Sequence, residues 1–500
     1  MMKGKTMHDN RVASINRQTV DVVPFIDGKS VHSASKETIE VFNPATGKRS
    51  MTIPAGCDTD VDRAVASARG AFDDGRWSEL PPSQKKGILS KFADLIEQEA
   101  GQLDILDAID MGKPVGLPGF NASDFIRFCA NAIDKVLGDV YTSDTTTFVA
   151  QHRVPRGVVG AVTPWNFPTV NAVMKLAPAL ATGNCVVLKP SECSSQSAMR
   201  LAHLAIEAGL PPGTFNVVPG RGEIVGRALA LHRDVDMIAF TGSTSVGKQM
   251  LQYAGQSNMK LVHAECGGKS PHIVFADFTD LDAVADGVAQ SILHNQGQIC
   301  VAGSRLLVQA AIEKPLVEKV TERMQQIVAG DPLDPKTTFG PLVNRRQMER
   351  VLDYISSGKQ SGATLVTGGR RMREESGGFF VEPTLFSNVA PDAKIAQEEI
   401  FGPVLSVISF NSIDEAIQLA NSTAYGLAAY VWTTDLATGM KVSKQIRAGT
   451  VCVRAVKPSG EGPGIAFSQE PVGQSGVGVE NGMAGMEAYL RRQVVWFDHG

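Results

Sequence analysis

VVGAVTP (158–164) opens a series of short apolar runs that continues with CVVLKP (185–190), FNVVPG (215–220) and MIAFTG (237–242). Between these runs, apolar side chains recur at helical spacing, as over 170–181 and 195–208. Short apolar strands that alternate with helices form a parallel sheet covered on both faces. The sequence therefore predicts an α/β unit built on a parallel sheet in this part of the chain.

A second alternating series begins near residue 271. Its apolar runs are PHIVFAD (271–277), SRLLVQ (304–309), VLSVISF (404–410) and AYVWTTD (429–435), with helical patterns over 280–295 and 312–328. Two consecutive series predict two α/β domains that face one another, with a boundary near Gly267 and Gly268. Nearer the N-terminus, residues 23–31 predict a strand, a turn and a strand, and 59–74 and 83–111 predict two amphipathic helices.

Length and composition exclude several classes of protein. A chain of 500 residues is too long for one hydrophobic core, and a formal net charge of -4 offers no basic surface to nucleic acid or an anionic membrane. We find no apolar run of the roughly 18 residues that a membrane span needs. The first ten residues, MMKGKTMHDN, lack the apolar core of a secretory signal, and residues 1–20 predict a mobile N-terminal arm.

The seven cysteines contain no CxxC pair, and the nine histidines have no ligand spacing. The sequence therefore predicts neither a disulfide framework nor a metal site, and the reducing cytoplasm is the expected location.

Cys300 stands in the segment NQGQICVAGSR (295–305), just before a predicted strand. A loop before a strand can expose a thiol to a cleft, where a polar environment that lowers its pKa would make it a nucleophile. The alternative is a buried core cysteine, the commoner fate of a single cysteine. His294 lies six residues earlier, but we expect a structural role for it because no third orienting group is apparent.

Two further polar residues follow predicted strands. Asn166 in PWNFP (164–168) could donate its amide N–H to an oxyanion at the carboxyl end of a strand, or it could cap a turn. Glu265 in HAECGGKS (263–270) could act as a general base if it is partly desolvated. The alternative for Glu265 is a surface carboxylate in a loop.

Several segments have features of a nucleotide site, and each is weak alone. FTGSTSVGK (240–248) joins a strand to a helix whose N-terminus could approach a pyrophosphate, and PGRGEIVG (219–226) resembles a dinucleotide fingerprint with one residue too many. In LKPSE (188–192), Lys189 and Glu192 could bind ribose hydroxyls or form an exposed ion pair. Glu399 and Phe401 in EEIFGPV (398–404) could hold a second ribose, or could simply lead into a strand.

Taken together, these segments resemble the aldehyde dehydrogenase superfamily. The resemblance runs from about residue 21 to 453 and preserves the order of PWNFP, KPSE, FTGST-VG, E-GGK, GQ-C and EEIFGPV. Within the superfamily, residues 257–277 and 295–308 are most similar to the γ-glutamyl-γ-aminobutyraldehyde dehydrogenase group.

The resemblance implies roles for individual residues. Cys300 would be the nucleophile that forms a thiohemiacetal and then a thioester, Asn166 and the Cys300 N–H the oxyanion hole, and Glu265 the base that activates water. The cofactor would be NAD⁺ rather than NADP⁺, because Glu192 would repel a 2′-phosphate. The implied cofactor-binding residues are Trp165, Lys189, Glu192, Gly222, Gly242, Ser243, Val246, Glu399 and Phe401.

The resemblance also implies a division of the chain. After an arm at 1–20, it implies a Rossmann-like NAD-binding domain (21–143 and 158–266), an α/β catalytic domain (267–453), a tunnel-mouth loop (454–482) and a small β oligomerisation element (144–157 and 483–500). In that element a β-arm at 144–157 would pair with a strand near 490–497, and such arms lie between subunits. A homodimer or homotetramer with a small-molecule aldehyde as substrate is therefore expected, without nucleic acid or membrane partners.

The chain departs from the family after Val453. Residues 454–482 read RAVKPSGEGPGIAFSQEPVGQSGVGVENG, longer and richer in Gly and Pro than the family pattern. Arg454 and Lys457 could favour an acidic aldehyde or be solvated loop charges, and Asn171 and Met174 hint at a flexible, non-aromatic substrate. We expect a flexible aliphatic ω-amino or acidic aldehyde. The alternatives are a CoA-acylating aldehyde dehydrogenase, and a catalytically silent NAD-binding member with a structural or binding role.

Overall fold

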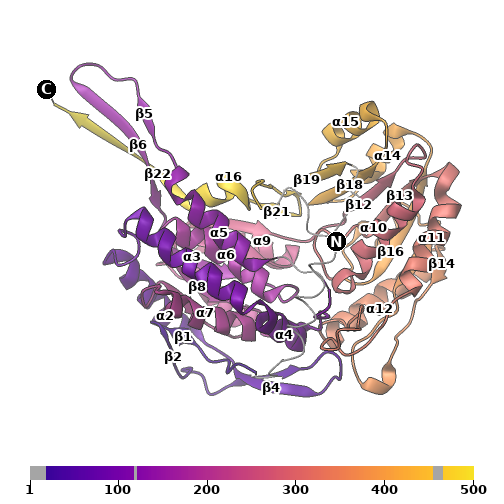
Figure 1. Cartoon of the computed structure of the whole chain (residues 1–500), viewed down its shortest axis with the longest axis horizontal. Coiled ribbons are helices and arrows are strands. Elements are labelled where there is room, and N and C mark those ends of the chain that lie inside the picture. The colour runs from indigo at the N-terminus through magenta and orange to yellow at the C-terminus, as the bar shows by residue number, and fades with distance from the viewer. Residues whose placement is uncertain (1–18, 118–120, 454–464, 500) are drawn as a thin grey trace.

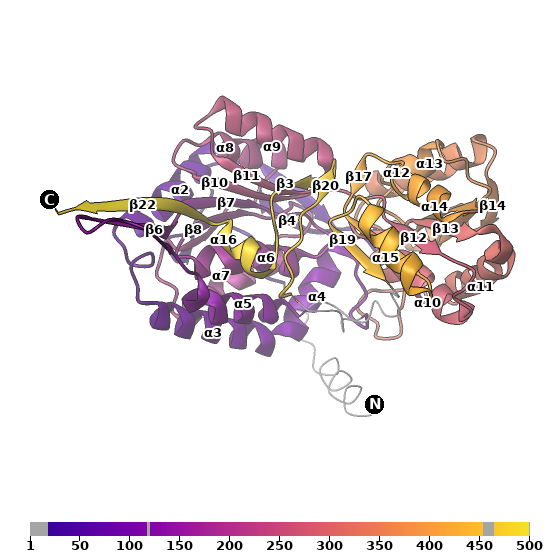
Figure 2. The same ribbon diagram turned by 90° about the horizontal axis from the view of Figure 1, so that it is seen from above.

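A computed structural model describes residues 19–117, 121–453 and 465–499 of the chain. Two lobes, each built around a large sheet, lie side by side, and a narrow arm projects from the first lobe (Figure 1). Seen from above, the arm points away from the second lobe (Figure 2). The sequence prediction of two α/β units, each built on a mostly parallel sheet, is confirmed.

The first lobe contains an eight-stranded sheet in the order β2-β1-β9-β8-β7-β10-β11-β21. Its centre is parallel, and β1 and β21 add antiparallel edges. The strands are β1 (Phe25–Ile26), β2 (Lys29–Ser30), β7 (Val158–Val162), β8 (Cys185–Lys189), β9 (Phe215–Val217), β10 (Met237–Thr241), β11 (Leu261–Glu265) and β21 (Gly476–Val477). Because β7 and β8 are buried at every position, they read as continuous apolar runs, as the sequence predicted.

Helices cover both faces of this sheet. One core contains Ile126, Leu176 and Leu204, and the other contains Val65 and Met250. The helices are α2 (Asp58–Asp73), α3 (Pro82–Gln98), α4 (Ala100–Met111), α5 (Ala122–Ala132), η1 (Ile133–Lys135), α6 (Pro168–Ala181), α7 (Gln196–Ala208), η2 (Gly222–Gly226), α8 (Arg227–Leu231), α9 (Thr244–Gln256) and α16 (Gly482–Glu487).

The prediction of one helix over 83–111 is wrong, because the chain leaves helical geometry at Glu99 and forms α3 and α4. Glu99 adopts φ −97° and ψ 9°, and its carboxylate accepts a hydrogen bond from Arg200 Nε at 2.6 Å. This tertiary contact with α7 holds a break that the amphipathic pattern does not reveal, since apolar residues continue at helical spacing on both sides of it.

The second lobe contains a seven-stranded sheet in the order β14-β15-β16-β13-β12-β18-β19, parallel except for β14. Its strands are β12 (Pro271–Val274), β13 (Arg305–Gln309), β14 (Thr364–Thr367), β15 (Thr384–Ser387), β16 (Val404–Phe410), β18 (Ala428–Trp432) and β19 (Thr450–Val453). Its helices are α10 (Leu281–Leu293), η3 (His294–Gly297), η4 (Ala310–Ile312), α11 (Glu313–Gln325), α12 (Arg345–Gln360), η5 (Glu374–Ser376), α13 (Lys394–Gln397), α14 (Ile413–Ala420) and α15 (Leu436–Gln445).

The arm is a three-stranded antiparallel sheet of β5 (Asp139–Tyr141), β6 (Thr147–Pro155) and β22 (Leu490–Asp498). β22 pairs with β6 without interruption from Leu490↔Pro155 to Asp498↔Thr147, which confirms the predicted strand pairing. Trp496 on β22 is 68% exposed, and Phe497 is 56% exposed. The arm therefore presents large apolar side chains that the described part of the chain does not cover.

Two smaller ladders complete the described structure: β3 (Thr38–Phe42) with β4 (Arg49–Pro54), and β17 (Tyr425–Gly426) with β20 (Val472–Gly473). β20 and β21 lie within 454–482, so the part of this segment that the structure describes contains strands and is not simply a loop. Arg454, Lys457 and the predicted arm up to residue 18 lie outside the described residues. No helix in the described part of the chain is long and apolar enough to cross a membrane.

Candidate active site

Cys300 lies in a turn between η3 and β13, where the two lobes meet. The chain enters this turn through three successive left-handed residues, Asn295 (φ 46°), Gln296 (φ 55°) and Gly297 (φ 69°). Non-glycine residues rarely adopt this conformation, so the surroundings must hold it. Val343 N–H donates to Gln298 Oε1 at 3.0 Å, and Gln298 Nε2 donates to the Asn295 carbonyl at 3.1 Å.

The structure brings Asn166 to the same turn. Asn166 Nδ2 donates to the Gln298 carbonyl at 3.0 Å, and Asn295 Nδ2 donates to the Asn166 carbonyl at 2.9 Å. An amide group has two N–H bonds, so the one aimed at Gln298 leaves a second for an acceptor beside Cys300. Asn166 is buried, and its position supports a donor role better than that of a turn cap on the surface.

Gly268 lets the Cys300 turn approach the end of the first lobe. A Cβ atom at Gly268 would lie 2.4 Å from the Cys300 carbonyl oxygen, closer than any real contact. Gly267 has a similar constraint, since its Cβ would lie 2.2 Å from Glu399 Oε2. The two glycines therefore allow the approach of a backbone turn and a carboxylate.

Glu265 is the last residue of β11, and only 9% of it is exposed. The alternative of a surface carboxylate in a loop is therefore wrong. Its carbonyl accepts a hydrogen bond from Gly242 N–H at 3.0 Å. Burial, and then the negative charge of Glu480, raise the pKa of Glu265 well above its ordinary value, against the opposing effect of Lys175.

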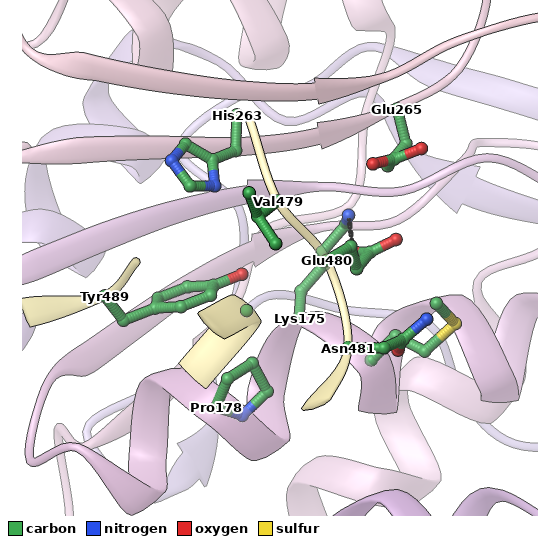
Figure 3. Close-up of a pocket in the computed structure, with 10 residues that line it drawn as sticks. Lys175, Pro178, His263, Glu265, Val479, Glu480, Asn481 and Tyr489 are labelled. Carbon is green, nitrogen blue, oxygen red and sulfur yellow. Dashed lines mark hydrogen bonds and ion pairs between the residues drawn. The ribbon is translucent and has the colours of Figure 1, made fainter. Parts of the chain in front are cut away.

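A small pocket of about 10 Å³ lies between Glu265 and the C-terminal segment (Figure 3). Lys175 on α6 forms an ion pair with Glu480 here, and Lys175 is 2% exposed. His263 and Tyr489 also line the pocket. Sequence analysis missed this pair, although a single lysine inside the apolar helix PTVNAVMKLAPALA was a signal, because a buried lysine needs a partner.

The Cys300 thiol is not ionised at neutral pH in this state. Burial raises its pKa to about 12, and the carboxylates of Glu399 and then Glu265 act in the same direction. The backbone N–H of Val301 has the opposite effect on this pKa. The thiol therefore needs a base or a change of surroundings to become the reactive thiolate.

Lys189 and Glu192 lie together at the end of β8, with Lys189 Nζ 3.0 Å from Glu192 Oε2. Burial opposes ionisation, yet the Lys189 ammonium holds the pKa of Glu192 below its ordinary value. Gly222 is adjacent, since a Cβ there would lie 3.9 Å from Lys189 Nζ. A cation, a carboxylate and an uncrowded backbone at a strand end can bind a polyhydroxylated ligand.

Ser243 caps the N-terminus of α9, where its hydroxyl accepts a hydrogen bond from Val246 N–H at 3.4 Å. Gly242 precedes it and is tied to the Glu265 carbonyl. The other N–H groups at this helix start have no intrahelical acceptor, as at any helix N-terminus. They can receive an anion such as a pyrophosphate.

Glu399, Phe401 and Trp165 meet on the second-lobe side. Gly268 N–H donates to Glu399 Oε1 at 3.0 Å, and burial raises the pKa of Glu399 to about 7. Phe401 is left-handed (φ 60°), and its ring meets Trp165 edge-on at 5.4 Å. Gln347 Nε2 holds the Phe401 carbonyl at 2.8 Å, which supports this strained residue.

The remaining expectations concern His294 and metals. His294 stacks on Phe167 with ring centres 6.1 Å apart, and burial lowers its pKa to about 4, which supports a structural role. No group of potential metal ligands occurs among the described residues. All seven cysteines are free, so none forms a disulfide.

Comparisons with known proteins find matches over most of the chain. Residues 31–495 match the model of the aldehyde dehydrogenase family. The NADP/NAD-dependent aldehyde dehydrogenase PuuC of Escherichia coli is 43% identical over 481 residues, which covers 94% of each chain.

Two solved structures have a TM-score of 0.93 and cover 99% of each chain. One is a γ-glutamyl-γ-aminobutyraldehyde dehydrogenase from Burkholderia cenocepacia, at 45% identity. The other is the indole-3-acetaldehyde dehydrogenase AldA of P. syringae, a mutant in complex with NAD⁺ and IAA, at 44% identity. Together with the family match over most of the chain, these similarities show that the protein belongs to the aldehyde dehydrogenase family.

Proposed function

We propose that the chain oxidises an aldehyde to a carboxylic acid with NAD⁺, through covalent attachment of the substrate to Cys300. The observation that carries the proposal is the meeting of Cys300, the Asn166 amide and the buried Glu265 at the junction of the two lobes. A nucleophile, an oxyanion donor and a base are the three groups that acyl chemistry requires.

In the first step the Cys300 sulfur adds to the aldehyde carbon, the thiol proton passes to a base, and the carbonyl oxygen becomes an alkoxide. The second N–H of Asn166 and the Cys300 backbone N–H stabilise that alkoxide. A bound NAD⁺ would supply the acceptor for the hydride of the thiohemiacetal carbon, and the substrate would then remain as a thioester on Cys300.

Glu265 then acts on water. Its carboxylate takes a proton from a water molecule, the hydroxide adds to the thioester carbonyl, and the carbon–sulfur bond breaks to release the acid and Cys300. Because the pKa of Glu265 is raised, it is a stronger base than an exposed glutamate, but it is ionised only above that raised value.

The chain's own residues fit NAD⁺. The start of α9 at Ser243 suits the pyrophosphate, Lys189 and Glu192 suit the hydroxyls of one ribose, and Glu399 suits those of the other. Trp165 and Phe401 add an aromatic wall beside Glu399. These assignments rest on donor chemistry and on the space that Gly222 leaves open.

For the substrate we propose a flexible aliphatic aldehyde that carries an ω-amino or acidic group. The similarity to a γ-glutamyl-γ-aminobutyraldehyde dehydrogenase supports this class, as do the non-aromatic side chains of Asn171 and Met174 near Asn166.

A panel of ω-amino, acidic, aliphatic and aromatic aldehydes, followed by NADH absorbance, tests activity and substrate class together. We expect the largest kcat/KM with ω-amino or acidic members.

Cys300→Ala should lower NADH formation by about a thousandfold or more on every member, because it removes the nucleophile. The matched control is Cys129→Ala, which alters a buried thiol on α5 away from the site and should retain activity. Unchanged turnover in Cys300→Ala would overturn the mechanism, and an unaltered protein that binds NAD⁺ but turns over no aldehyde would favour a binding role.

Glu265→Gln should preserve a first burst of NADH and lower the steady-state rate by about a hundredfold, because glutamine cannot accept a proton from water. In the wild type, hydrolysis should increase as pH rises through the raised pKa of Glu265, since the ionised form is the base. Rapid mixing across a pH series should show that the hydrolysis rate rises with pH in the wild type. The same series should show no such rise in the variant.

The control for this variant is Glu318→Gln on the exposed side of α11. If Glu265→Gln instead turned over at the wild-type rate and formed acyl-CoA whenever CoA was supplied, the CoA-acylating alternative would replace hydrolysis.

Glu192 should make NAD⁺ the preferred cofactor, by about tenfold or more in kcat/KM, because a carboxylate repels a 2′-phosphate. Glu192→Gln should lower the ratio of kcat/KM with NAD⁺ to kcat/KM with NADP⁺. Glu223→Gln, which changes an exposed carboxylate nearby, should leave this ratio unchanged. Initial rates with both cofactors at one aldehyde concentration give the ratio, and a wild-type preference for NADP⁺ would contradict the assignment.

We also propose that the arm of β5, β6 and β22 lies between subunits of a homodimer or homotetramer. Exposed Val494, Trp496 and Phe497 on a chain-terminal strand support this, because an uncovered apolar edge favours association. Light scattering should give a mass of two or four chains, and Trp496→Ser with Phe497→Ser should reduce it. A wild-type mass of one chain would rule out the proposal.

A further inference from the structure

Tyr430, on β18, reaches from the second-lobe sheet to the turn that carries Cys300. Its hydroxyl donates a hydrogen bond to the Val301 carbonyl at 2.9 Å. Val301 directly follows Cys300 in the chain. The contact therefore joins a residue of a regular strand, 129 positions away in sequence, to the backbone beside the nucleophile.

The ring of Tyr430 has little freedom. In the parallel ladder Tyr430 is the partner of His272 on β12, so the two side chains lie on the same face of the sheet. Their rings stack with centres 4.8 Å apart and an interplanar angle of 23°. His272 is held in turn by Trp432, whose Nε1 donates to His272 Nδ1 at 3.1 Å. Burial lowers the pKa of His272 to about 3, so the imidazole stays neutral and the stack does not change with pH in any working range.

The turn that carries Cys300 lies outside the strands and helices of the described chain, so single contacts hold its backbone. Ala302 N–H donates to the Ile299 carbonyl at 3.1 Å, and the Cys300 carbonyl lies against Gly268. The Tyr430 hydroxyl adds the contact at Val301, the residue next to the nucleophile. The position of the Cys300 sulfur therefore depends on how this turn is held.

We propose that Tyr430 is a positioning residue for Cys300: its hydroxyl fixes the Val301 carbonyl and thereby holds the turn that carries the nucleophilic sulfur. The proposal rests on the proposed function of Cys300. Tyr430 itself has no contact with substrate or cofactor in this proposal. The rings of His272, Tyr430 and Trp432 form a rigid support, and among the described residues the phenol is the polar contact from that support to the turn.

Tyr430→Phe is a sharp test because it keeps the stacked ring and removes only the hydroxyl. The readout is the rate of Cys300 alkylation by iodoacetamide, without cofactor or aldehyde, from about pH 7 to about pH 10, with the Cys300 peptide quantified by mass spectrometry. A turn that has lost this contact exposes the buried thiol more often, so at any one pH the rate should rise about threefold. The kcat for aldehyde oxidation should fall about tenfold, and the KM for NAD⁺ should stay within about twofold.

The matched control is Tyr141→Phe, which also removes a hydroxyl that has a hydrogen bond, the one that Gln151 Nε2 donates at 2.7 Å, but on the arm. It should leave both alkylation and kcat unchanged. A wild-type kcat or a wild-type alkylation rate in Tyr430→Phe would overturn the proposal. A KM for NAD⁺ that rises as much as kcat falls would also overturn it, because a general loss of structure affects both. If Cys300→Ala retained activity, the proposed function itself would fail, whereas an inactive Cys300→Ala beside a wild-type-like Tyr430→Phe would remove only the role of Tyr430.

Discussion

The hydrogen bond from Asn166 Nδ2 to the Gln298 carbonyl is the contact on which the site depends, because it joins the two lobes at the nucleophile. Asn166 and Glu265 lie in the first lobe, and Cys300, Glu399 and Tyr430 lie in the second. The two sheets can move relative to one another unless polar contacts hold them together at the junction. Two more hydrogen bonds are of this kind. Asn295 Nδ2 donates to the Asn166 carbonyl, and Gly268 N–H donates to Glu399. This arrangement requires a run of left-handed residues before Cys300. It also requires hydrogen-bond partners for the buried polar groups.

Buried charge is the second theme of the junction. Glu265 and Glu399 are both held at raised pKa values, mainly because burial disfavours a carboxylate that has left water. The Lys175–Glu480 pair places a positive charge beside Glu265 and partly offsets this. Burial makes Glu265 a stronger base than an exposed carboxylate, and burial also disfavours the thiolate form of Cys300. A neutral thiol is less reactive toward oxidants than a thiolate, so burial protects Cys300 from side reactions.

Much of this arrangement could be predicted from local sequence. The apolar runs at 158–164 and 185–190 became buried parallel strands because a strand covered on both faces must be apolar throughout. Asn166, Cys300 and Glu265 were proposed from their places beside strand ends, and the structure brings Asn166 to the Cys300 turn. The break at Glu99 was not predictable, because it depends on Arg200, which lies 101 residues further along the chain. The Lys175–Glu480 pair spans 305 residues, and the support of Tyr430 by His272 requires a ladder register that no local pattern encodes.

The place of the C-terminal segment in the fold has a consequence for how the protein is made. β21 closes one edge of the first sheet, Glu480 completes the charge arrangement behind Glu265, and β22 covers β6, yet all three lie after residue 475. The strands and helix that contact them are synthesised much earlier, and until then one sheet edge and one buried lysine have no partner from this segment. A chain that stops before β21 therefore lacks both the last strand of the first sheet and the ion-pair partner of Lys175. The first lobe can finish folding only after this segment has been made.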